Sequence, residues 1–231
     1  NFKGIKNIGR YIFKDCTSLE KIIIGEGCSS IGSYAFSGCL SLKEVDMPST
    51  LTSIGTYAFS GCSSLKNIEF PATITGIGEN AFNCCTSLKT VVIEEGVTTI
   101  GMAAFADCKS LTSVTIPKSV TSLGEGAFNG CTSLTSVTIP GSVKHIGKRT
   151  FQNCSALRTL VLEEGVESID IQAFESTINL DSVTIPASMK TIDNSAFRYG
   201  AGTPSRVYFN SEVQLEKFKD CFPDSTQLIV Q

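Results

Sequence analysis

Residues 111–133 read LTSVTIPKSVTSLGEGAFNGCTS, and the apolar positions of this segment recur through the chain every 23 residues. Its phenylalanine belongs to a column of nine with no insertion between members: Phe13, Phe36, Phe59, Phe82, Phe105, Phe128, Phe151, Phe174 and Phe197. A leucine column keeps the same step: Leu19, Leu42, Leu65, Leu88, Leu111, Leu134, Leu157 and Leu180. A repeat of constant length buries its apolar face by stacking on copies of itself, which predicts a solenoid.

Each unit also has a readable local pattern. Val114 and Ile116 alternate with polar residues, which is the period of a half-buried strand, and Pro117 ends that strand because proline cannot donate to a ladder. Residues 120–123 predict a second short strand. Residues 125–131 are too few for a stable helix, and we expect them to form a helical or 3₁₀ turn that inserts its phenylalanine into the core.

Glycine and cysteine form two further columns. The glycines, replaced twice by Asp, predict a backbone position with positive φ: Gly9, Gly32, Gly55, Gly78, Gly101, Gly124, Gly147, Asp170 and Asp193. The cysteines are expected to be small buried thiols that fill the core: Cys16, Cys39, Cys62, Cys85, Cys108, Cys131 and Cys154. Cys28 takes a core position, whereas Cys84 should point outward and be the most reactive thiol. Disulfides between neighbours in the column are not expected, because their side chains point the same way.

The string Leu-x-x-Val-x-Ile-Pro-x-x-Val-x-x-Ile-Gly-x-x-Ala-Phe-x-x-Cys-x-Ser resembles the BspA-like (Treponema-type) leucine-rich repeat family over roughly residues 5–197. The resemblance implies a right-handed leucine-rich-repeat solenoid, with parallel strands on one face and a second short strand in each coil. It also implies a cell-surface or secreted protein of host-associated microbes, some of whose relatives adhere to host matrix proteins. Fold alone does not give function.

The whole chain, 1–231, is expected to form one solenoid of about nine coils over 5–209, closed by a capping unit over 210–231. In that unit Ser211 is expected to N-cap a short helix over 212–220, with a last strand at 227–230. Because Asn1 falls in the middle of a coil, we expect natural sequence upstream of it.

Composition excludes several functions. A formal charge of −3 with no basic excess argues against nucleic-acid binding. No apolar run is long enough for membrane insertion of this segment. The single histidine, His145, should face outward without a nucleophile beside it, and no Cys-x-x-Cys pair suggests zinc. We therefore expect no catalytic residues, no cofactor and no metal site.

The outward residues of the longer strands are candidates for partner binding. Most are Ser or Thr, but Ile23, Val92 and Val161 place an apolar residue outward in every third coil. The same three coils replace proline by an acidic turn, so a period of 69 residues is superposed on that of 23. The three apolar residues suit an elongated partner; alternatively, they record duplication of a three-coil block.

Two charged clusters complete the candidates. Glu44, Asp46 and Glu69 form an acidic corner on the strand face. A basic coil could bind a sulfated glycan or an acidic partner, and it contains Lys144, His145, Lys148 and Arg149. The alternative for both clusters is an ordinary solvated surface.

The sequence therefore predicts a non-enzymatic interaction protein, extracellular or at the cell surface, that binds a protein or glycan. The alternative is a passive structural spacer that displays another module and has no ligand of its own.

Overall fold

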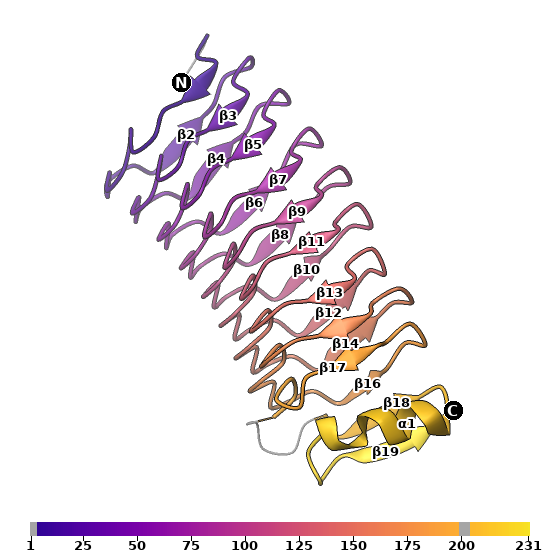
Figure 1. The fold of residues 1–231 in the computed structure, drawn as a ribbon. Helices are drawn as coiled ribbons and strands as arrows, with labels where there is room; N and C mark the ends of the chain where they lie inside the picture. Colours follow the sequence, from indigo (N-terminus) through magenta and orange to yellow (C-terminus); the bar gives the residue numbers. More distant parts are fainter. Residues whose placement is uncertain (1–3, 199–203) are drawn as a thin grey trace.

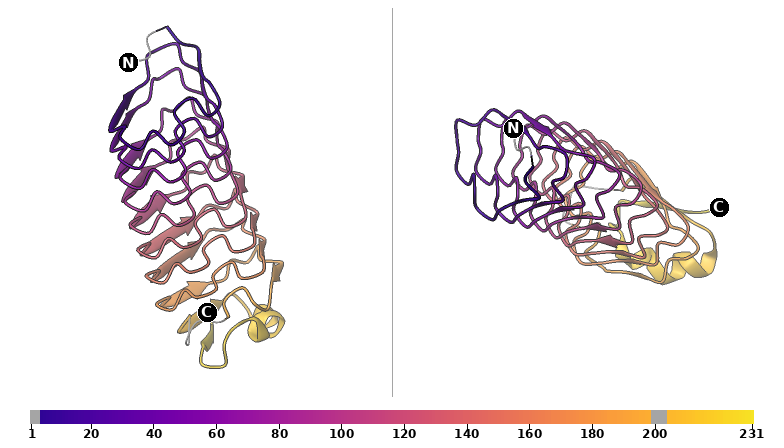
Figure 2. Two further views of the ribbon diagram at one scale, coloured as in Figure 1. Left: turned by 90° about the vertical axis from the view of Figure 1, so that its left-hand side faces the viewer. Right: turned by 90° about the horizontal axis from the view of Figure 1, so that it is seen from above.

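The computed structural model describes residues 4–198 and 204–231, and it shows an elongated stack of coils (Figure 1). Residues 1–3 and 199–203 of the predicted solenoid lie outside the described residues. Two rows of parallel strands run along the stack, one on each side of the coils (Figures 1 and 2). The predicted solenoid of 23-residue coils is confirmed, with little helix.

One row has strands of three or four residues and is called the longer row. It carries the Val-x-Ile strands: β2 (Lys21–Ile23), β4 (Glu44–Asp46), β6 (Asn67–Glu69), β8 (Thr90–Val92), β10 (Ser113–Thr115), β12 (Ser136–Ile139), β14 (Thr159–Leu162), β16 (Ser182–Thr184), β18 (Arg206–Phe209) and β19 (Gln227–Val230). The shorter row carries two-residue strands: β1 (Asn7–Ile8), β3 (Ser30–Ile31), β5 (Ser53–Ile54), β7 (Gly76–Ile77), β9 (Thr99–Ile100), β11 (Ser122–Leu123), β13 (His145–Ile146), β15 (Ser168–Ile169) and β17 (Thr191–Ile192). Both predicted strands of the unit are present.

The core lies between the two rows and repeats in columns. From Phe13 to Phe197 each phenylalanine ring stacks on the next, with ring centroids 5.1–5.5 Å apart. Phe36 and the later members are almost fully buried, whereas Phe13, in the first coil, is only partly covered. A constant repeat length therefore produces face-to-face contact between identical side chains.

The segment that carries the phenylalanine is a chain of linked turns, and not the predicted helical or 3₁₀ turn. Gly126 and Gly130 adopt left-handed φ angles of 62° and 74°, which interrupt any helix. The N–H groups of Gly126, Phe128 and Gly130 donate to carbonyls of the following coil, with N···O distances of 2.8–2.9 Å. The turns thus form a third ladder between coils, beside the two rows of strands.

The glycine column has a different physical cause from the predicted one. In the columns from Gly9 to Gly147 the glycines do not have positive φ; the left-handed positions lie two and six residues later. A Cβ added at Gly124 would lie 2.4 Å from the backbone N of Met102 in the preceding coil. Glycine is needed there because two backbones approach closely. A Cβ added at Gly147 would lie 3.7 Å from its nearest atom, which leaves room for a side chain. The next two coils indeed carry a side chain at this position, Asp170 and Asp193.

The coils are not evenly joined. In the part of the chain that the structure describes, β4 does not pair with β6, and the shorter row divides between β11 and β13. Asp46 and Glu69 would face each other across a β4–β6 ladder, and like charges in that position are destabilising. Between β10 and β12 only Ser113 and Ser136 remain registered partners. The coil of β10 and β11 is therefore loosely joined, on both rows, to the coil of β12 and β13.

The C-terminal segment covers the last coil (Figure 1). Helix α1 (Glu212–Phe218) begins after Ser211, whose hydroxyl accepts from the N–H of Gln214, and the 3₁₀ helix η1 (Lys219–Cys221) follows it. Phe222 places its ring centroid 5.1 Å from that of Phe197 and continues the aromatic stack. These contacts fit the division predicted at 209 and 210, which itself stays a prediction.

Candidate partner-binding surfaces

The three apolar residues of the 69-residue period all lie on the outer face of the longer row. Ile23, Val92 and Val161 are 40%, 48% and 44% exposed. They stand in one line along the stack, three coils apart, which corresponds to about 14 Å between neighbours at the usual strand spacing. They do not touch one another, so any ligand that used all three would be elongated.

The acidic turns of the same coils have a structural task. The Glu95 carboxylate accepts from the backbone N–H groups of Lys118 and Ser119 in the next coil, at 3.2 and 3.1 Å. Glu164 binds two backbone N–H groups of the next turn in the same way, and Glu26 binds the N–H and the hydroxyl of Ser49. These carboxylates join neighbouring turns by hydrogen bonds. The bonds give a structural reason for one acidic residue in each of the three turns that recur with the 69-residue period.

The acidic corner is partly neutralised by a lysine that sequence reasoning missed. Lys21 Nζ lies 2.6 Å from Glu44 Oε1 and 3.4 Å from Asp46 Oδ2. Its hydrogen bond to Glu44 raises the pKa of Lys21. Lys21 precedes Glu44 by one repeat, so the period alone could have found the pair. A groove of about 380 Å³ opens beside this corner, where β4 and β6 are unpaired.

The basic coil lies on the shorter row and on the turn after it, away from the line of apolar residues. Its four residues are exposed, and two have side-chain partners in the next coil: His145 Nδ1 lies 2.6 Å from Ser168 Oγ, and Arg149 Nε donates to Gln172 at 2.9 Å. Glu167 pairs with Lys190 at 2.7 Å, and this hydrogen bond lowers the pKa of Glu167. The structure does not bring the basic coil together with the candidates on the longer row.

The cysteine column is buried from Cys39 onward, and its thiols also make hydrogen bonds. Each Sγ donates to the carbonyl of a phenylalanine in the preceding coil, as from Cys108 to Phe82 at 3.3 Å. Burial raises the pKa of Cys39 to about 11 and that of Cys154 to about 12. Such thiols are poor nucleophiles.

Two cysteines of the chain are exposed. Cys16 was expected inside the core but is exposed, because among the described residues no earlier coil covers this position. Cys84 points outward as expected. Partial burial, with the nearby Asp107 charge, raises the pKa of Cys84, which lowers its thiolate fraction.

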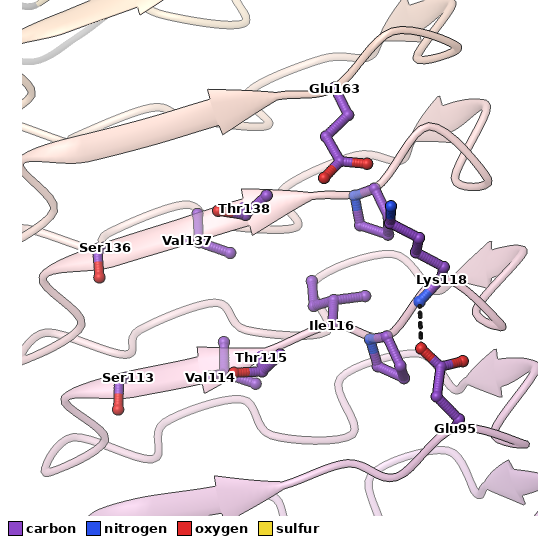
Figure 3. Close-up of a pocket in the computed structure, with 12 residues that line it drawn as sticks. Glu95, Ser113, Val114, Thr115, Ile116, Lys118, Ser136, Val137, Thr138 and Glu163 are labelled. Atoms are coloured by element: carbon purple, nitrogen blue, oxygen red, sulfur yellow. Dashed lines mark hydrogen bonds between the residues drawn. The ribbon is translucent and has the colours of Figure 1, made fainter.

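Sequence reasoning also missed a groove of about 460 Å³ between β10 and β12 (Figure 3). Val114, Ile116 and Val137 line its base, and Thr115 and Thr138 lie along its sides. The side chain of Glu163 points toward it from the neighbouring coil (Figure 3). The signal that could have indicated this groove is proline: both neighbouring coils carry one after the strand, Pro117 and Pro140, as do the unpaired coils of β4 and β6, Pro48 and Pro71.

Among the residues described, no three His, Cys, Asp or Glu side chains gather in a way that could hold a metal ion. In the same part of the chain no helix has the length and apolar character needed to cross a membrane.

The stacked coils, with one Val-x-Ile strand and one leucine column per unit, define a leucine-rich repeat solenoid. The chain belongs to the family of the BspA type leucine rich repeat region, whose pattern matches residues 2–109 and 75–202 in six copies. The resemblance seen in the sequence is thereby confirmed. No curated protein matches this chain.

Several solved structures are similar. The Treponema pallidum leucine rich repeat protein is 28% identical, with 78% of this chain and 74% of that chain covered and a TM-score of 0.56. A leucine-rich repeat protein of Eubacterium ventriosum is 22% identical, with 99% and 79% covered and a TM-score of 0.56. A leucine rich cell surface protein of Faecalibacterium prausnitzii is 24% identical, with 98% and 83% covered and a TM-score of 0.45.

Leucine-rich repeat proteins of this family typically bind other proteins and are typically not enzymes. Membership therefore supports a role in protein interaction in general.

Proposed function

We propose that this chain is a non-enzymatic interaction protein of the cell surface or extracellular space, which presents the longer row of strands to a protein or glycan partner. The surface location rests on its membership of the BspA-type family. The observation that carries the proposal is the line of Ile23, Val92 and Val161, each at least 40% exposed on an otherwise polar face. Apolar side chains that the fold leaves uncovered in a regular line mark a contact surface better than scattered ones do.

The fold supplies the stiffness that such a surface needs. Aromatic stacking and the turn ladder join neighbouring coils along the described stack, and strand pairing adds to them at most junctions, so the line of apolar residues keeps its spacing without a ligand. A preorganised surface loses little conformational entropy on binding. The same stiffness would serve a passive spacer, and the experiment must separate the two functions.

The test is a binding screen of the purified chain against immobilised extracellular-matrix proteins and glycans. The variant carries Ile23→Ser, Val92→Ser and Val161→Ser, and the matched control carries Ile171→Ser and Ile178→Ser. The control residues are 41% and 48% exposed but lie outside the longer row. We expect the first variant to lose at least tenfold in affinity for a partner that the control still binds. A chain that binds nothing in the panel, or two variants that bind equally, would favour the spacer.

A further inference from the structure

The groove between β10 and β12 is one of three places in the described part of the longer row where strand pairing weakens. β4 and β6 do not pair, and β14 and β16, like β10 and β12, keep a single registered pair. β8 and β10 share three registered pairs, and β12 and β14 share four, whereas β10 and β12 share only Ser113 and Ser136. The groove therefore has closely paired strands on both sides. It holds about 460 Å³, enough for one large side chain with part of its backbone.

The two sides of the groove are alike, and each combines Ser and Thr in the wall with one exposed valine beyond it. Val92 pairs with Thr115 on one side, and Val161 pairs with Thr138 on the other, so one exposed valine flanks each wall. Two buried proline rings, Pro117 and Pro140, lie at one end. A ligand seated here would place an apolar group over the base and cover both valines.

The rim of the groove carries excess negative charge. The turns beside it hold four carboxylates and one ammonium: Glu94, Glu95, Glu163, Glu164 and Lys118. Glu95 and Glu164 are engaged by backbone N–H groups of the next coil. Within the described residues Glu163 makes no ion pair, and its side chain points toward the groove (Figure 3). Its carboxylate can therefore receive a cation.

We propose that this groove is a docking site for a protein segment that inserts an apolar side chain between β10 and β12 and pairs a neighbouring Lys or Arg with Glu163. The proposal rests on the proposed function, because it names the chemistry of a partner for the same face. Charge complementarity selects a basic segment over an acidic one. The contact is smaller than a standard interface, so binding of the segment alone is weak, with Kd of about 0.1–1 mM.

The experiment uses the whole chain with Ile, Leu and Val methyl groups labelled for NMR, and it titrates defined peptides. The probe is acetyl-GSKLKSG-amide, with acetyl-GSELESG-amide and acetyl-GSKSKSG-amide as comparisons. We expect the first peptide to cause saturable shifts at Val92, Val114, Ile116, Val137 and Val161, and the other two to cause much smaller ones.

Two variants test the mechanism. Glu163→Gln should weaken binding of the lysine peptide about twofold to fivefold, as expected for a partly exposed ion pair. Glu125→Gln is its matched control, since Glu125 is exposed beside the shorter row, and it should change nothing. Thr115→Tyr fills the groove from an outward, strand-favouring position and should abolish the shifts while leaving the circular dichroism spectrum unchanged.

Equal shifts from the acidic and basic peptides, shifts centred elsewhere, or no response at the groove methyls would overturn the proposal. If a matrix protein or glycan still binds the longer row in the screen while these methyls do not respond, only the docking site fails. If the peptide binds but no partner is found in the screen, the docking site stands by itself.

Discussion

Replacing glycine by alanine at two equivalent positions tests how the coils are joined. At Gly124 the added Cβ would lie 2.4 Å from Met102 N and 2.5 Å from Gly101 C, and these backbone atoms cannot turn away. At Gly147, one repeat later, the nearest atoms lie 3.7 Å away. The two substitutions are chemically identical, so any difference between them reports the spacing of the coils.

The magnitudes follow from opposing effects. Overpacking costs about 1–3 kcal/mol, and removing glycine stabilises by about 0.4–1 kcal/mol through the unfolded chain. Gly124→Ala should therefore destabilise by about 1–2 kcal/mol, which lowers Tm by about 2–8 °C in a chain of this size. Gly147→Ala meets no crowding and should be neutral or stabilising by up to about 1 kcal/mol.

Thermal and urea unfolding followed by far-ultraviolet circular dichroism would measure both, since the chain has no tryptophan. Gly126→Ala is a third comparison, because its φ is 62° while its Cβ would lie 3.8 Å from the nearest atom, so strain alone should cost about 1 kcal/mol. Equal destabilisation by Gly124→Ala and Gly147→Ala would refute the explanation of the glycine column by close approach.

Three further predictions concern charge and thiols. With Ellman's reagent, the two exposed cysteines should react rapidly in the folded chain and all ten after denaturation; more fast thiols would contradict the buried column. Lys190→Ala should raise the pKa of Glu167 in an NMR titration. Because pairing with Lys190 lowers the pKa of Glu167, the ion pair stabilises the folded chain above the pKa that Glu167 has in the unfolded chain, about 4.3. This stabilisation is lost as the pH falls through the lower pKa of Glu167 in the folded chain. A variant with Lys148→Glu and Arg149→Glu should be retained on a heparin column for a shorter time than a control variant with Lys66→Glu and a second exposed lysine changed to Glu. Equal retention of the two variants would contradict glycan binding by the basic coil.

The repeat length and the residue type at each position are sufficient to predict most of the fold. Val114 and Ile116 alternate with polar residues, so their strand and its buried side follow from local geometry. Stacking at a constant step then places Phe128 on Phe105 and Phe151. The outward direction of Val92 and Val161 follows from the same alternation.

The sequence predicted less about contacts between coils. The left-handed turns could be predicted only in part. The position six residues after the glycine column carries Gly, Asp or Asn in most coils, as at Gly38 and Asp107, which favours positive φ. The position two residues after it gives no such signal, because Ala103 and Arg149 adopt positive φ and glycine stands there only once. The sequence pattern also attributed the glycine column to positive φ, although glycine is needed at Gly124 because the backbone of the preceding coil lies close to it.

The sequence by itself determined the solenoid, the buried columns and the polar face with its line of three apolar residues, because each depends on a period that can be counted along the chain. Only the tertiary structure decided where neighbouring coils separate. At β4–β6 and β10–β12 strand pairing is lost or reduced, and residues in equivalent columns, such as Gly124 and Gly147, meet different surroundings in neighbouring coils. The groove beside Glu163, where we place the basic segment of a partner, is a product of that separation.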